Sequence, residues 1–257
     1  MNRLLKTYLR VMGLELSRIP PAIIKLSNPG GERRPIANIR LFLEDVKARG
    51  FNPQGIIDVG ANSGSWTRMA LSIFPRARVL MIEPQDEMSH DLQELCRSFS
   101  SVEYVRAGAG RESGELVQTI WEDLVGSSFL PEVSDDKLAD GTQRMTPIVT
   151  IDDLLSERES FVPDLVKLDI QGFELEALKG ATLAFGVTQI FILETSLYHF
   201  MKDMPTTADC IKFMAERGYD LYDVTDYLRR PLDGALAQID LAFALREGSL
   251  RSSDRWG

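Results

Sequence analysis

Residues 55–66 constrain the fold more than any other part of the chain. An apolar strand-like run ends at Val59, small residues follow, and a helical pattern then places apolar side chains at i, i+3, i+4 and i+7, namely Trp66, Met69, Ala70 and Ile73. This predicts a buried strand joined to a helix by a tight turn. Such a turn exposes backbone N–H groups and lets a ligand approach the main chain closely. In doubly wound α/β proteins it is where nucleotides bind.

Short apolar runs alternate with amphipathic segments through the rest of the chain. Strands are predicted at 56–59, 79–82, 102–106, 165–168, 190–193, 221–224 and 239–245, and helices at 66–74, 85–98, 173–183 and 207–218. Two further strands, 116–121 and 146–150, flank a polar loop at 123–142. This alternation predicts a mostly parallel sheet between helix layers. The turn-rich residues 230–234 predict an antiparallel hairpin of the last two strands at one edge.

The charge of the chain is negative overall but uneven. The net charge of −9 argues against a protein that grips nucleic-acid phosphates, so no nucleic-acid partner is expected. Residues 1–25 carry five basic residues and one acidic residue, a net charge of +4, which leaves −13 on the rest. Two cysteines without a CxxC motif indicate neither a disulfide framework nor zinc. No run approaches the roughly 20 apolar residues of a membrane span, and charges interrupt any signal-peptide core. We therefore expect a cytoplasmic protein.

Three regions are expected along the chain. Residues 1–50 form an N-terminal helical extension, 51–250 form the main domain, and 251–257 form a tail. The extension contains an apolar helical stripe over 5–19, ended by a Pro-Pro pair, and a second helix over 38–49. A basic amphipathic helix suits peripheral contact with a membrane or a partner. Alternatively, the apolar stripe of this helix packs on the domain or on a second copy of the chain in a homo-oligomer. We favour this second interpretation.

Carboxylates end four of the first five predicted strands in the α/β core. The strand ends carry, in chain order, Asp58, Glu83, Ala107-Gly108, Asp169 and Glu194. Ligands bind beyond the carboxyl ends of strands in an open α/β sheet. Glu83, roughly 20 residues past the glycine turn, is placed to bind a ribose with two free hydroxyls. A surface carboxylate in a βα loop is the alternative, which we rank lower because of the turn upstream.

The glycine turn has its own spacing, Gly60-x-x-x-Gly64, with Asn62 inside. It matches neither the dinucleotide pattern G-x-G-x-x-G nor the phosphate-binding P-loop. Asp58 would repel a pyrophosphate and would suit a cation-bearing ligand. An adenosine with a cationic amino-acid tail is S-adenosylmethionine, which we predict as the cofactor. The predicted cofactor-binding residues are Asp58, Gly60, Asn62, Gly64, Glu83, Ala107, Gly108 and Asp169.

Lys167 and Asp169 stand two residues apart in the fourth core strand and so share one face. A charged pair in a central strand is costly unless its members satisfy each other. A buried structural ion pair explains Lys167. The strand end favours a site role for Asp169, which would hold the cofactor amine, orient the substrate hydroxyl, or do both.

Several motifs together resemble the FkbM family of S-adenosylmethionine-dependent methyltransferases. They are residues 57–64, 82–84, 150–155, 166–181 and 239–243, and the resemblance covers roughly residues 50–246. In the block at 166–174 the family pattern is K-I-D-V-E-G-x-E, and Gln171 stands here in place of the common Glu. The resemblance implies a class I (Rossmann-like) methyltransferase fold with a seven-stranded, mostly parallel sheet. It also implies O-methylation of a hydroxyl on a sugar, glycan, glycolipid or secondary metabolite.

Methyl transfer to an alcohol requires alignment of the acceptor oxygen and removal of its proton. The candidate catalytic residues are Asp169, Glu194, His199 and Lys167. A pair formed by Asp169 and Glu194 would either bind a divalent cation such as Mg²⁺ or keep one acid protonated. The alternative to a catalytic role for Glu194 is a structural hydrogen bond. The alternative for His199 is an incidental position in a loop. Residues 122–145 are expected to shape the acceptor pocket. A cofactor-fold binding or scaffold protein without catalysis is the alternative function.

Overall fold

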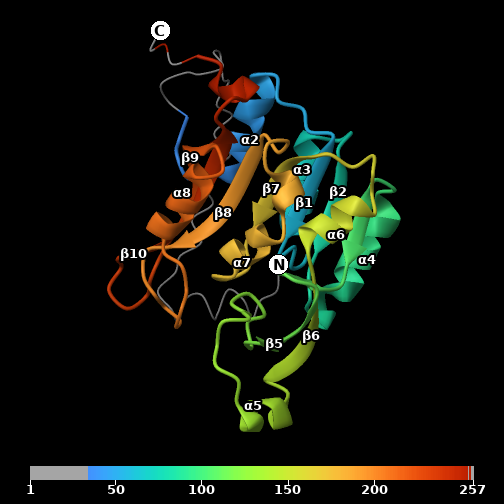
Figure 1. The fold of residues 1–257 in the computed structure, drawn as a ribbon, viewed down its shortest axis with the longest axis vertical. Helices are drawn as coiled ribbons and strands as arrows, with labels where there is room; N and C mark the ends of the chain where they lie inside the picture. The colour runs from blue at the N-terminus through green and yellow to red at the C-terminus, as the bar shows by residue number, and fades with distance from the viewer. Residues whose placement is uncertain (1–33, 254, 256–257) are drawn as a thin grey trace, which may run out of the picture. The chain divides into compact units, whose positions relative to one another are not determined.

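The computed structural model describes residues 34–253 and 255 (Figure 1). The predicted helix over 5–19 and its basic residues lie outside the described residues. The first described helix, α2 (Ile39–Ala48), matches the second predicted helix, and the Asn38 side chain caps it by accepting from the backbone N–H of Leu41. Within the described part of the chain, none of the helices is long and apolar enough to cross a membrane.

A seven-stranded sheet carries the fold. Its strand order is β3-β2-β1-β7-β8-β10-β9. Its members are β1 (Gly55–Val59), β2 (Arg78–Ile82), β3 (Val102–Val105), β7 (Pro163–Leu168), β8 (Ile190–Ser196), β9 (Tyr219–Arg229) and β10 (Leu236–Leu245). The first five strands are parallel, and β10 is antiparallel to both of its neighbours. This is the class I, Rossmann-like methyltransferase fold, and the predicted terminal hairpin is confirmed.

Alternating side chains of the strands feed two separate cores. Ile56 points to the side covered by α2, α3 (Ser65–Ile73) and α4 (Ser89–Ser98). Ile57 points to the opposite side, covered by α6 (Ile151–Ser156), α7 (Glu174–Lys179) and α8 (Thr207–Ala215). Because both faces are buried, the central strands consist of nearly continuous apolar residues, as their sequences indicated.

A smaller sheet stands apart from the large one. It has the order β4-β6-β5, with β4 (Gly108–Ala109), β6 (Gln143–Val149) and β5 (Gly114–Thr119). Figure 1 shows this sheet extending away from the central strands, with α5 (Asp135–Asp140) at its far end. The two extra strands were predicted, but the prediction of an unbroken polar loop at 123–142 is wrong because α5 forms within it.

Helix boundaries differ from the sequence prediction mainly at three helices, one of which is α8, which ends at Ala215 and not at residue 218. The helix after β2 begins at Ser89 and not at residue 85, because a short 3₁₀-helix (Asp86–Met88) precedes it. The helix after β7 ends at Lys179, and a second 3₁₀-helix (Thr182–Ala184) follows. Gly180 lies between them, and a Cβ there would stand 2.2 Å from the carbonyl oxygen of Gly110. This close backbone approach fixes α7 against the segment that follows β4. A third 3₁₀-helix (Ser249–Arg251) follows β10.

Candidate cofactor and active site

A cavity of about 130 Å³ lies at the carboxyl ends of the central strands. Six of the eight predicted cofactor-binding residues line it, namely Gly60, Asn62, Glu83, Ala107, Gly108 and Asp169. They come from the ends of β1, β2 and β7 and from the segment that enters β4. The structure thus brings together residues that are up to 109 positions apart in the sequence, at the edge where an open α/β sheet binds its ligands.

The turn after β1 depends on Gly60. This residue has a φ of +77°, and a Cβ would stand only 2.0 Å from the carbonyl oxygen of Asp169. The Gly60 N–H donates to the carbonyl of Ile82 at 2.9 Å. Glycine therefore lets the turn lie directly between the ends of β2 and β7. Gly64, the second glycine of the motif, does not line the cavity. It caps α3 with a φ of +76° and packs beside Leu92 and Leu95 of α4.

Glu83 joins the glycine turn to the end of β2. Its carboxylate accepts from the backbone N–H of Asn62 at 2.8 Å and from that of Gln85 at 2.9 Å. Burial raises the pKa of Glu83, while these two hydrogen bonds oppose the rise. A carboxylate offers about four lone-pair sites. Acceptor capacity therefore remains for the hydroxyls of a ribose in the cavity.

The structure does not place Asp58 in the cavity. Alternation along β1 turns its side chain toward α3, where it is fully buried and one oxygen accepts from the Thr67 hydroxyl at 2.6 Å. The other oxygen has no hydrogen-bond partner among the residues that the structure describes. Desolvation raises the pKa of Asp58, against the opposing effect of Lys167, its cross-strand neighbour on β7. Its predicted contact with the cofactor amine is therefore not part of this geometry.

Lys167 and Asp169 form the expected ion pair. The Lys167 Nζ lies 2.9 Å from the Oδ2 of Asp169, with the lysine side chain 7% exposed and the aspartate 34% exposed. Desolvation opposes charge on the lysine, but the nearby carboxylates of Asp169 and Asp58 prevail and raise the pKa of Lys167. Lys167 is thus a buried, charged partner that holds Asp169 at the cavity wall.

Asp169 and Glu194 are brought together through Gln171. The Gln171 Nε2 lies 2.8 Å from Glu194 Oε2 and 3.2 Å from Asp169 Oδ1. Glu194 is half-buried within β8, two residues before the strand ends, and lies beside the cavity wall and not on it. Desolvation, followed by repulsion from Asp169, Glu174 and Asp240, raises the pKa of Glu194 well above its ordinary value.

Asp240 is a neighbour that sequence reasoning did not assign to the site. It pairs directly with Glu194 across β10 and β8, which places both carboxylates on one face of the sheet. Desolvation, together with Asp169, raises the pKa of Asp240 to about 7. The sequence contains a signal for Asp240, because this acid interrupts the apolar residues of 239–244.

His199 lies away from the cavity. It is exposed in the loop after β8, and its Nδ1 stands 2.8 Å from the carbonyl oxygen of Met204. That carbonyl can only accept, so the ring donates a hydrogen bond within its own loop. The structure therefore gives His199 a loop-fixing contact and does not bring it to the other candidate catalytic residues.

Residues 120–142, between β5 and β6, are called the insert. Its residues 124–129 form one wall of the cavity and are called the strap below. The Leu124 carbonyl accepts from the side-chain amides of Asn62 (3.1 Å) and Gln85 (3.0 Å), while the Ser127 hydroxyl donates to Gln85. Val125, Ser127 and Phe129 line the cavity. The volume is below the roughly 300–1,000 Å³ typical of small-molecule sites. Outward movement of the strap is the direct way to enlarge it.

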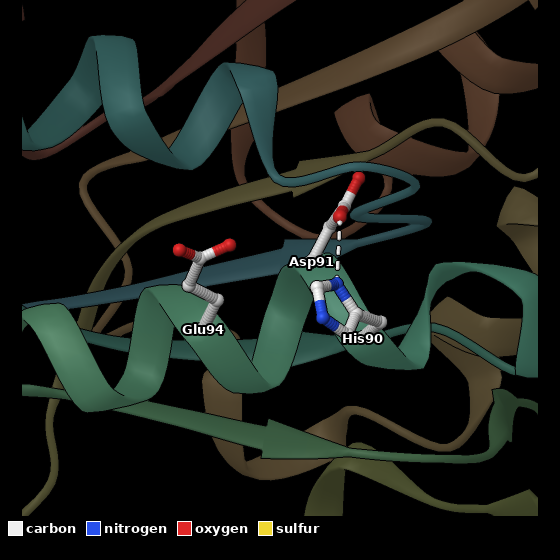
Figure 2. Close-up of side chains that lie close together, drawn as sticks. All are labelled: His90, Asp91 and Glu94. Atoms are coloured by element: carbon white, nitrogen blue, oxygen red, sulfur yellow. Dashed lines mark hydrogen bonds and ion pairs between the residues drawn. The ribbon is translucent and has the colours of Figure 1, made fainter.

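Another group of polar side chains lies on the outer surface of α4. Figure 2 shows His90, Asp91 and Glu94 on adjacent turns, with the His90 ring 3.3 Å from Asp91. All three are exposed, and none lines the cavity. This arrangement is that of a solvated helix surface.

Comparisons with known proteins show what this chain is similar to. Residues 58–221, more than half of the chain, match the family described as the methyltransferase FkbM domain. The chain is 27% identical over 157 residues to methyltransferase sdnD of Sordaria araneosa, which covers 49% of this chain and 59% of that protein. It is 30% identical over 164 residues to hexuronic acid methyltransferase AglP of Haloferax volcanii, which covers 61% of this chain and 60% of that protein.

The chain therefore spans about 60% of the length of these curated relatives. Among solved structures, a methyltransferase FkbM from Methylobacillus flagellatus KT aligns with a TM-score of 0.47 and 20% identity. That alignment covers 74% of this chain and 43% of the other.

Proposed function

The chain belongs to the FkbM methyltransferase family, and on that premise we propose that it transfers a methyl group from S-adenosylmethionine to a hydroxyl oxygen. The acceptor is a sugar, glycan, glycolipid or secondary metabolite. The observation that supports this best is a single cavity that gathers Gly60, Glu83 and Asp169 at three adjacent strand ends. A nucleoside cofactor fits this arrangement, because the glycine turn admits close approach and Glu83 retains acceptor capacity.

We assign the adenosine part of the cofactor to the β2 side of the cavity. Glu83 would bind the ribose hydroxyls, and the strap residues Val125 and Phe129 would cover the base. Gly108 lets the strap lie close to this part of the cavity, because a Cβ there would stand 2.6 Å from the Phe129 ring and push the strap outward. When bound, the cofactor supplies the activated methyl group.

The remaining polar groups act on the acceptor and on the cofactor amine. Asp169 lines the cavity and is oriented by Lys167 and Gln171, so we assign it to the amine, the acceptor hydroxyl, or both. Glu194 lies off the cavity wall, and the Gln171 amide joins it to Asp169, so we assign Glu194 to position Asp169. We assign Asp169, which lines the cavity, to receive the hydroxyl proton.

The direct test is Asp169→Asn. Turnover would be measured as S-adenosylhomocysteine released with a panel of hydroxyl acceptors that includes hexuronic acids and glycans. We expect a loss of at least about 100-fold in kcat/KM, typical of removing a group that handles the proton. The exposed Glu159→Gln serves as the control and should leave the rate unchanged.

Two outcomes would count against this proposal. Near wild-type methylation by Asp169→Asn with unchanged cofactor affinity would refute the assigned role of Asp169. Tight S-adenosylhomocysteine binding by the wild type without turnover on any acceptor would favour the alternative, a binding or scaffold protein that retains the cofactor fold.

A further inference from the structure

The side chain of Gln171 occupies the space between two carboxylates. One amide nitrogen contacts both Asp169 Oδ1 and Glu194 Oε2, while Lys167 contacts the other oxygen of Asp169 at 2.9 Å. A carboxylate without a proton can only accept hydrogen bonds. The amide nitrogen, and not the amide oxygen, must therefore face the pair, because the reverse orientation would oppose lone pairs.

The surrounding charges explain why this space needs a donor. Asp169, Glu194 and Asp240 stand beside one another on neighbouring strands, and Lys167 is the cation that contacts this group among the described residues. Like charges in adjacent cross-strand positions destabilise a sheet. Such a group needs protons, hydrogen-bond donors or a metal cation between its members. Gln171 provides donors at the point where the first two carboxylates meet.

The backbone also commits Gln171 to this position. Its φ of +55° is in the left-handed region, which is unfavourable for a residue with a side chain. The Ser128 hydroxyl of the strap donates to the Gln171 carbonyl at 2.9 Å and holds this conformation. The strained backbone and the tether together aim the amide at the carboxylates.

We propose that Gln171 is a positioning residue whose amide takes the place of a divalent cation between Asp169 and Glu194. The amide would orient both carboxylates for the reaction, so the site operates without a bound metal ion. This inference rests on the proposed function, since it assigns the metal requirement of that same site. It replaces the divalent-cation role that the sequence left open for the carboxylate pair with a hydrogen-bond donor from the chain itself.

The experiment uses the full chain and measures S-adenosylhomocysteine affinity by calorimetry, in EDTA and in Mn²⁺. For the wild type we expect the same affinity in both. For Gln171→Glu we expect affinity in EDTA to fall about tenfold, because a third carboxylate replaces a donor. Mn²⁺, or a decrease in pH from 8 to 6, should restore that affinity, since either supplies positive charge between the carboxylates. Gln189→Glu is the matched control and should behave as wild type, because this half-buried residue immediately precedes β8, at the edge of the sheet opposite the cavity.

Direct titration with Mn²⁺ provides a second measurement that requires no cofactor. We expect Gln171→Glu to bind Mn²⁺ at least about tenfold more tightly than the wild type. The proposal is overturned if EDTA weakens cofactor binding of the wild type and Mn²⁺ restores it, or if Gln171→Glu matches the wild type in both titrations. A wild type that binds no S-adenosylhomocysteine would instead contradict the proposed function, while the Mn²⁺ titration would still test Gln171. If Gln171→Glu does not fold, the wild-type comparison in EDTA and Mn²⁺ decides alone.

Discussion

Replacement of Glu174 by Gln should make the stability of the protein less sensitive to pH. Glu174 begins α7, is 1% exposed, and accepts from the backbone N–H groups of Ile170 (2.9 Å) and Gly172 (3.2 Å). It thereby closes the turn that carries Asp169 and Gln171. A carboxamide oxygen can accept the same two bonds, so we expect Glu174→Gln to fold.

The magnitude follows from the pKa of this carboxyl. Burial raises the pKa of Glu174 from 4.5 to about 7, despite its two backbone hydrogen bonds. The folded state therefore binds the proton more tightly than the unfolded state, and the free energy of unfolding falls as pH rises from about 4.5 through about 7. Between pH 5 and pH 8 this one group lowers the free energy of unfolding by roughly 2 to 3 kcal/mol, at about 1.4 kcal/mol per pKa unit. The carboxamide that replaces it in Glu174→Gln does not titrate, so the variant avoids this loss.

Urea unfolding monitored by tryptophan fluorescence at pH 5, 6, 7 and 8 measures the difference. The free energy of unfolding of Glu174→Gln, relative to wild type, should increase by roughly 2 to 3 kcal/mol from pH 5 to pH 8. The exposed Glu112→Gln is the control and should follow the wild type across the range. Parallel curves for the wild type and Glu174→Gln would refute the reasoning, because they would show that this carboxyl titrates normally in the folded protein.

Two further substitutions test the cavity itself. Glu83→Gln removes a charged acceptor for the ribose, so S-adenosylhomocysteine affinity measured by calorimetry should fall about 10- to 100-fold. The thermal midpoint should fall as well, because the two Glu83 oxygens accept from two backbone N–H groups and a carboxamide has only one oxygen. Unchanged cofactor affinity would exclude Glu83 from the cofactor site. Gly60→Ala places a Cβ 2.0 Å from the Asp169 carbonyl at a φ of +77°, so the thermal midpoint and cofactor affinity should both drop. Gly114→Ala, with open space around it, should preserve both properties, and equal behaviour of the two variants would contradict the proposed close approach.

The sequence predicted the part of the site that depends on strand order. Period-two and period-3.6 patterns located the central strands and helices, and parallel strands necessarily bring their carboxyl ends to one edge. Glu83 and Asp169 were found for this reason. Asp58 was misplaced because the spacing of the motif does not reveal that the end of β1 directs the Asp58 side chain toward Thr67. The hydrogen-bond partner of a side chain just before such a turn depends on the helix that packs over the strand, here α3.

Contacts between distant segments were beyond prediction. Gln85 and Ser127 share a wall of the cavity only because the strap folds back over the end of β2. Nothing in the local sequence of either residue specifies that contact. Asp240 could have been predicted as a site residue, because an acid inside a buried strand requires a partner. Its neighbour Glu194 becomes apparent only when β10 is known to pair antiparallel with β8. Residues 135–140 formed α5 where their polar composition indicated a loop.

The shared acceptor at Leu124 has a consequence for how this chain can change over evolution. One backbone oxygen joins the near end of the insert to Asn62 and Gln85, and a backbone group cannot be lost by substitution. The far end, at α5, has no buried residues. Substitutions at the distal end should therefore be tolerated by the fold, while the attachment that shapes the cavity wall depends on the main chain. The insert thus combines an exposed end that side-chain changes can alter with a root that they cannot remove.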